Sequence, residues 1–177
     1  KRMLPRALER SRILSRLGLE ESKYLLATIH RAENTDNQQR LREIVEAFNR
    51  LEQTVILPLH PRTQKEIVKN GLRIASHVHV VEPLGYLDMI RLEQSARIIL
   101  TDSGGIQKEA YWLGIPCITL RDETEWVETA ETGWNILTGA DTSRIIEAVH
   151  ACRTPATRLP LYGDGNAAGK IAAILMS

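Results

Sequence analysis

Short apolar segments alternate with segments of helical periodicity along almost the whole chain. Runs rich in β-branched residues indicate buried strands at residues 24–29, 54–59, 78–81, 97–100, 117–120 and 134–137. Apolar residues recur with helical spacing at residues 38–53, 61–72, 86–94, 106–113, 126–131, 142–152 and 167–175. Strands that alternate with helices pair in parallel through right-handed crossovers. The pattern therefore predicts an α/β fold, a doubly wound parallel sheet with helices on both faces.

Composition narrows the class of protein. At 177 residues and 43% hydrophobic content, the chain is long enough for one globular domain with a real core. Its 23 basic and 22 acidic residues nearly balance, and only 5% of residues are aromatic, which argues against a nucleic-acid partner. The sequence has no apolar run of about 18 residues, so we expect no membrane span. Cys117 and Cys152 fit no disulfide or metal spacing and indicate reduced thiols of a cytoplasmic protein.

The run from residue 98 to residue 110 carries the strongest functional signal. A predicted strand ends there in a turn, Ser103-Gly104-Gly105, and a helix follows. Orphan amides and the helix dipole make such a turn a site for an anion such as phosphate, and glycine lets the ligand approach the backbone. Glu109 follows Gly105 by one helical turn, and its carboxylate suits a ribose diol. The alternative is a tight structural turn with Glu109 as a solvated charge.

Polar residues gather where the predicted strands end. They occupy residues 30–34, 60–63, 82–85, 102–105 and 121–125. In a doubly wound sheet, ligands bind outside the carboxyl ends of the strands. Because a purely structural sheet does not need this arrangement, the pattern favours a functional edge.

Individual motifs at this edge have both functional and structural interpretations. His30 could hydrogen-bond or transfer a proton, and Arg31 could grip phosphate; the competing interpretation is a helix start capped by Asn34 or Asp36, with His30 packed. In the acidic loop 121–128, Arg121 and Thr124 are the candidate ligand contacts, against a merely solvated loop.

Three further histidines and a late glycine pair carry weaker signals. His60 precedes Pro61 and equally suits a helix start or a functional role. His77 and His79 have no third ligand nearby, so we expect no metal site there. Residues 163–165 lack a preceding strand and are interpreted as a turn.

With these motifs in order, the chain resembles the non-hydrolysing UDP-N-acetylglucosamine 2-epimerase family. The resemblance rests on seven motifs in family order, at residues 28–34, 58–61, 82–87, 100–110, 114–116, 120–125 and 162–165. It implies the C-terminal half of a glycosyltransferase-B-type fold of two Rossmann-like domains, with the active site between them. Residues 1–22 would then be a linker or lead-in helix from an absent N-terminal domain, and residues 23–177 the nucleotide-binding domain. Since Lys1 and Arg2 precede Met3 without an opening strand, we expect an excised fragment.

The resemblance also implies roles for particular residues. Ser103, Gly104 and Gly105 would hold the diphosphate of UDP, and Glu109 the ribose. Leu84 and Met89 would flank the uracil. His30 matches a position implicated in catalysis, whereas the acid and base would lie in the absent domain, so the fragment alone should be inactive.

The implied reaction interconverts UDP-GlcNAc and UDP-ManNAc by eliminating UDP and adding it back, without metal or cofactor. Trp126 and Lys108 depart from many bacterial members, which leaves open another UDP-acetamido sugar, such as an N-acetylfucosamine or diacetamido uronic acid derivative. A glycosyltransferase of the same fold and a simple nucleotide-sugar binding module compete with the epimerase interpretation. The expected partners are UDP, a UDP-N-acetylhexosamine, the absent domain and a second copy in a homodimer.

Overall fold

The computed structural model describes residues 3–163 and 166–176. All paired strands are parallel and form one sheet in the order β3-β2-β1-β4-β5-β6. The strands are β1 (Tyr24–Thr28), β2 (Thr54–Pro58), β3 (Val78–Val81), β4 (Ile98–Thr101), β5 (Cys117–Thr119) and β6 (Asn135–Leu137). The helices are α1 (Leu4–Arg10), α2 (Ile13–Leu17), α3 (Ala32–Thr35), α4 (Gln38–Arg50), α5 (Pro61–Lys69), α6 (Tyr86–Ser95), α7 (Gly104–Leu113), α8 (Val127–Glu131), α9 (Thr142–Ala151) and α10 (Ala167–Leu175). The predicted doubly wound sheet is confirmed.

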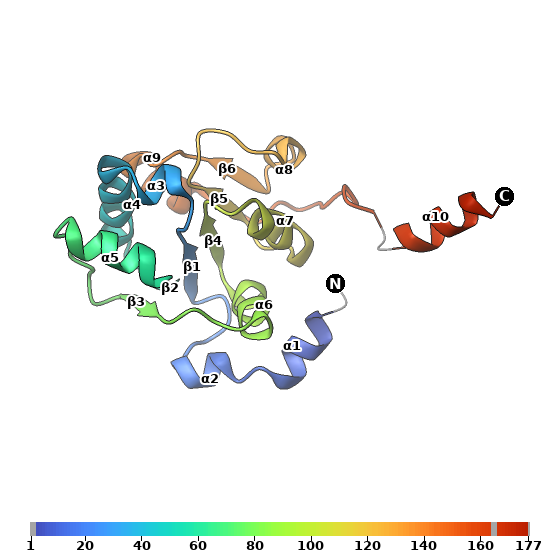
Figure 1. The fold of residues 1–177 in the computed structure, drawn as a ribbon, viewed down its shortest axis with the longest axis horizontal. Coiled ribbons are helices and arrows are strands. Elements are labelled where there is room, and N and C mark those ends of the chain that lie inside the picture. The colour runs from blue at the N-terminus through green and yellow to red at the C-terminus, as the bar shows by residue number, and fades with distance from the viewer. Residues whose placement is uncertain (1–2, 164–165, 177) are drawn as a thin grey trace.

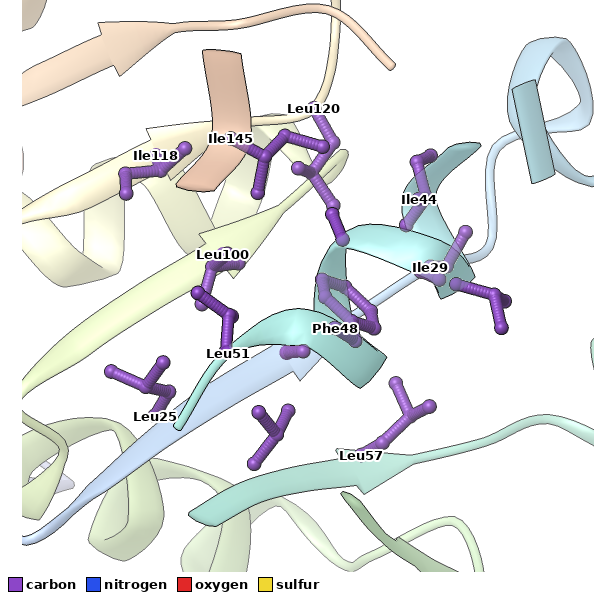
Figure 2. Close-up of a cluster of buried hydrophobic side chains, with 14 of the residues drawn as sticks. Leu25, Ile29, Ile44, Phe48, Leu51, Leu57, Leu100, Ile118, Leu120 and Ile145 are labelled. Carbon is purple, nitrogen blue, oxygen red and sulfur yellow. The ribbon is translucent and has the colours of Figure 1, made fainter. Parts of the chain in front are cut away.

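Helices cover both faces of the sheet (Figure 1). Successive residues of β1 alternate between two cores, with Leu25 on the face of α4, α5 and α9, and Leu26 on the face of α2, α6 and α7. Figure 2 shows the first core, to which α4 contributes Phe48, α9 contributes Ile145 and β4 contributes Leu100. Burial on both faces explains why the central strands are continuous apolar runs in the sequence.

Most predicted boundaries are met within three residues, and the differences have local causes. The helix predicted at 106–113 begins at Gly104, because the Ser103 side chain caps it by accepting from the backbone N–H of Ile106 (3.4 Å). The two glycines therefore form the first turn of α7 and not the connecting turn. Neither Asn34 nor Asp36 caps a helix by its side chain; Asn37 caps α4, accepting from the N–H groups of Gln39 and Arg40.

Other expectations fall at the periphery. His60 caps α5, its Nδ1 accepting from the N–H of Arg62 at 3.2 Å, which supports the helix-start interpretation. Gly163 has a left-handed φ of 72°, but residues 164–165 of the expected turn lie outside the described residues. α10 buries no residue and extends away from the sheet (Figure 1). Among the helices described, none is long and apolar enough to cross a membrane.

Candidate functional site

The carboxyl ends of β1, β4 and β5 bring the predicted site residues together. His30 and Arg31 follow β1, Ser103 follows β4, and Arg121 follows β5. These three strands are neighbours in the sheet, so their ends meet at one edge. The alternation of elements alone therefore assembles residues that are far apart in the sequence.

Asp102 organises the centre of this edge, and the sequence interpretation missed it. Its carboxylate is fully buried and accepts hydrogen bonds from the backbone N–H of His30 (3.1 Å) and of Arg31 (3.0 Å) and from the amide of Asn34 (3.1 Å). Burial raises the pKa of Asp102, but these donors and the His30 ring outweigh it and hold the pKa below its ordinary value. The sequence feature that could have identified Asp102 is its position directly after a buried strand and directly before Ser103.

The same carboxylate orients the His30 ring. His30 Nδ1 lies 3.0 Å from Asp102 Oδ1, while about half of the imidazole, 51%, is exposed. A carboxylate at Nδ1 fixes the tautomer and leaves Nε2 for a ligand, which is how proteins orient functional histidines. His30 is therefore a held side chain at the ligand edge and not a packed core histidine.

The N-terminus of α7 lies directly under the loop 121–126. A Cβ on Gly104 would lie 3.3 Å from Glu125 Oε2 and 3.8 Å from Arg31 Nη2. The indole N–H of Trp126 donates to the Gly104 carbonyl at 2.7 Å. Because Gly104 has no side chain, charged groups from two other loops approach this helix end, which its dipole makes favourable for anions.

Two guanidinium groups converge on Glu125 at this helix end. Arg121, 5% exposed, donates through Nη1 to both carboxylate oxygens (3.0 and 2.9 Å), and Arg31 Nη2 lies 3.9 Å away. The pKa of Glu125 is lowered by a hydrogen bond to its own backbone and by Arg121. The fold thus brings Arg121 and Arg31 to the same carboxylate, and this carboxylate of the chain itself lies beside the α7 N-terminus.

Aromatic rings hold the loop in place. Lys108 Nζ lies 4.3 Å from the ring centroid of Trp126, 4.7 Å from that of Tyr162 and 5.3 Å from that of Trp112. Tyr162 also meets Trp126 edge to face at 5.4 Å. These contacts anchor the loop 121–126 to α7 through Trp126 and Lys108.

The predicted ribose and uracil residues lie along α6 and α7. Glu109 accepts a hydrogen bond from the Tyr86 hydroxyl at 3.0 Å, so its carboxylate is not simply solvated. Leu84 and Met89 are half-buried and pack against the core between these helices and the sheet. Leu84 and Met89 thus pack against one core cluster, Glu109 contacts the first residue of α6, and the contacts of all three to a nucleotide stay a prediction.

An open hollow of about 870 Å³ lies beside this edge, along α3 and the start of α4. Glu33, Asp36, Asp122 and Glu123 line it, against the single guanidinium of Arg40. This excess of carboxylates disfavours an anion there. The α7 end is therefore the better candidate for an anionic ligand.

Comparison with known proteins agrees with this geometry. The family model for UDP-N-acetylglucosamine 2-epimerase matches residues 1–176. A UDP-N-acetylglucosamine 2-epimerase homolog of Methanococcus maripaludis is 46% identical over 93% of this chain and 47% of its own length. The UDP-2,3-diacetamido-2,3-dideoxy-D-glucuronate 2-epimerase of Pseudomonas aeruginosa is also 46% identical, over 93% of this chain and 48% of its own.

Solved structures are similar as well. The UDP-GlcNAc 2-epimerase of Methanocaldococcus jannaschii, in complex with UDP-GlcNAc and UDP, superposes with a TM-score of 0.83 at 36% identity. The match covers 99% of this chain and 51% of that one, so the chain spans about half the length of its relatives. The sequence match over residues 1–176 and the shared fold establish that the chain belongs to the UDP-N-acetylglucosamine 2-epimerase family.

Proposed function

We propose that this chain is the UDP-binding half of a UDP-N-acetylglucosamine 2-epimerase, an isomerase that interconverts UDP-GlcNAc and UDP-ManNAc. The observation that carries the proposal is the meeting of the α7 N-terminus with Arg31 and Arg121, next to the oriented ring of His30. The chain would form the C-terminal Rossmann-like domain of a glycosyltransferase-B-type fold, because it spans about half of each relative.

Each site residue has a proposed contact. The amides at Ser103, Gly104 and Gly105 bind the diphosphate, together with the two arginines. Glu109 accepts hydrogen bonds from the ribose hydroxyls. Leu84 and Met89 flank the uracil. His30 contacts the substrate near the bond that breaks.

The proposed reaction is an elimination followed by an addition. A base takes the proton from C2 of the sugar, the C2 electron pair forms a C1–C2 double bond, and the C1–O bond breaks with its pair on the diphosphate. Addition then returns UDP to C1 and a proton to the opposite face of C2. No net oxidation occurs, so the route requires no redox cofactor, and the family resemblance implies no metal. The proposed acid and base lie outside this chain.

The site of this chain would act on the leaving group. Negative charge grows on the diphosphate as the C1–O bond breaks, and oriented amides with two guanidinium groups stabilise that charge more strongly than they stabilise the substrate. The same groups retain UDP for the addition. Asp102 keeps the His30 ring in one orientation during both steps.

A second candidate substrate is a UDP-acetamido sugar that carries a carboxylate. The relative from Pseudomonas aeruginosa is named for such a sugar and is as similar as the first relative. Lys108, whose ammonium contacts rings but no carboxylate among the residues described, lies one helical turn from Gly104. This cation favours a carboxylated sugar over a neutral one.

Two further expectations concern the whole protein. We propose that the protein acts in the cytoplasm on UDP-sugars. We also propose that an N-terminal domain of the same polypeptide completes the active site, which would lie between the two domains. We also propose a homodimer, which light scattering of the full-length protein tests directly.

Proton NMR of the full-length protein with UDP-GlcNAc tests the function. UDP-ManNAc should appear without any acceptor, whereas the 177-residue chain alone should yield no product. A glycosyltransferase would release UDP only when an acceptor is present, and a binding module would yield nothing. Product from UDP-2,3-diacetamido-2,3-dideoxyglucuronate but not from UDP-GlcNAc would favour the carboxylated substrate.

A further inference from the structure

Glu93 of α6 is a buried carboxyl that the proposed mechanism does not use. The residue is 1% exposed, and neither oxygen has a hydrogen-bond partner among the described residues. Buried carboxyls are rare and normally paired, because an unmade hydrogen bond costs free energy. The position therefore calls for a function beyond packing.

Glu93 faces a small cavity that it shares with Glu109. The cavity measures about 40 Å³ and lies between α1, α6 and α7. Its walls are Leu4, Tyr86, Ile90, Glu93, Glu109, Trp112 and Leu113. This volume exceeds the roughly 10–15 Å³ that one water needs. Two carboxyl groups from different helices thus face one space large enough for a bridging water.

Glu93 carries a proton in this setting. Burial raises the pKa of Glu93 to about 9, and the charge of Glu109 contributes to the rise. The other titratable groups around it are Tyr86 on its own helix and the buried thiol of Cys117 on β5, neither of which is cationic. A protonated carboxyl is a hydrogen-bond donor, and the carboxylate of Glu109 is the acceptor on the facing wall.

Only one of the two carboxylate oxygens of Glu109 has a hydrogen-bond partner among the described residues. The Tyr86 hydroxyl donates to Oε1 at 3.0 Å, and Oε2 has no partner among the residues described. A carboxylate that is to accept from a ribose needs a fixed orientation, and supporting donors normally provide it.

We propose that Glu93 is a positioning residue, which donates a hydrogen bond across the cavity to Glu109, directly or through one water, and fixes Glu109 toward the ribose. The inference rests on the proposed binding of UDP. In this proposal, a protonated and buried Glu93 supports Glu109, the carboxylate that would bind the ribose. Glu93 would not touch the nucleotide.

The test compares two ligands on the 177-residue chain by calorimetry. The ratio of the dissociation constants of 2′,3′-dideoxy-UDP and UDP isolates the contact to the ribose hydroxyls. For wild type we expect a ratio of about 10 or more, as for hydrogen bonds to a charged group. Glu93→Gln keeps a donor and should keep the ratio, whereas Glu93→Met should lower it at least threefold toward the value of Glu109→Ala.

The outcomes separate the two proposals. An unchanged ratio in Glu93→Met overturns the positioning role, even where the melting temperature shifts, because a packing role would weaken both ligands alike. Glu93→Leu gives the same readout should the Met variant not fold. A wild-type ratio of one, or no UDP binding, overturns the ribose contact or the proposed function, and the positioning role falls with it.

Discussion

Asp102 and Glu93 are equally buried carboxyl groups with opposite protonation. Asp102 is 0% exposed and Glu93 1%, one directly after β4 and the other within α6. Asp102 accepts from three N–H donors and contacts the His30 ring, and its pKa lies below its ordinary value. Glu93 has no donor among the described residues, and its pKa rises to about 9. Local donors, and not burial, therefore decide whether these carboxyls carry charge.

Their places in the fold explain the difference. Asp102 follows β4 at the carboxyl edge, where the chain leaving β1 still has backbone N–H groups without a ladder partner. Glu93 lies within α6, where the helix uses its own backbone donors internally. The edge can stabilise negative charge, its own or that of a ligand, and the helix layer cannot.

The largest effect should come from Asp102→Ala. It leaves buried donors of His30, Arg31 and Asn34 unpaired, so the free energy of unfolding should fall by about 3 kcal/mol or more. For a chain of this length the melting temperature should fall by roughly 10 °C. Asp141→Ala, which removes an exposed helix cap, should cost only about 1 kcal/mol. Equal losses for the two variants would contradict the network.

The pH dependence of the same variant has a defined sign. Because the folded pKa of Asp102 is depressed, its stabilisation is complete above the unfolded value of about 3.9 and is lost as pH falls through the folded pKa. Wild type should therefore lose stability in acid faster than Asp102→Ala. Urea unfolding from about pH 3 to about pH 6 measures both slopes.

The second effect concerns His30 in the full-length protein. If the ring assists departure of UDP, His30→Asn should lower kcat by about a hundredfold. The ring is half exposed, and Asp102 keeps three other donors in this variant, so the melting temperature should change little. His150→Asn, exposed on α9 away from the edge, is the control. Activity that falls only in step with lost stability would remove His30 from the mechanism.

Sequence periodicity was sufficient for the sheet but not for the short helices. The central strands were predicted because burial on both faces makes them apolar without interruption, as in residues 98–101. β3, with His79 and Val80 exposed, was predicted from its β-branched residues alone. α3 was not predicted, because four residues carry no helical period, and α1 and α2 were treated only as a lead-in. Ile13 nevertheless packs in the core beside α6, a contact that only the three-dimensional fold defines.

Edge position predicted the candidate site better than it predicted the roles within it. The strand-end rule collected His30, Ser103 and Arg121, which the fold places at one edge. It could not distinguish Asp102 as the organiser, because that role depends on backbone donors from another strand. Glu93 was invisible for a related reason: a Glu at a helical position is normally solvated, and only tertiary packing buries it.

The third effect concerns Glu93, whose influence on stability should have the opposite pH dependence to that of Asp102. The folded pKa of Glu93, about 9, exceeds its unfolded value, so its contribution to stability is complete below about pH 4.3 and is lost as pH rises through 9. Glu93→Gln should therefore gain stability relative to wild type between about pH 5.5 and about pH 8, by at most about 1.4 kcal/mol per pH unit. Glu147→Gln, exposed on α9, controls for surface charge. Parallel curves for wild type and Glu93→Gln would mean that Glu93 is ionised.

The smallest effect concerns Glu125, a carboxylate that is exposed and still charged. Its ion pair with Arg121 is half in solvent, with 52% of the Glu125 side chain exposed, so the pair contributes under about 1 kcal/mol. Glu125 Oε2 stands at the α7 end where we place the diphosphate. Binding UDP must bring two anions together or release Glu125 from Arg121, whereas Glu125→Gln keeps the shape and removes the charge.

UDP affinity should therefore rise severalfold in Glu125→Gln, up to about tenfold, and more at low salt than at high salt. Calorimetry on the 177-residue chain measures this affinity. Glu128→Gln is the control, because it removes an exposed carboxylate of α8 that forms no ion pair with Arg31 or Arg121 among the described residues. A fall in affinity would show instead that Glu125 orients Arg121 for the ligand. The Glu125 carboxylate would then be part of the binding site, just as the N–H donors around Asp102 are part of what keeps that residue ionised.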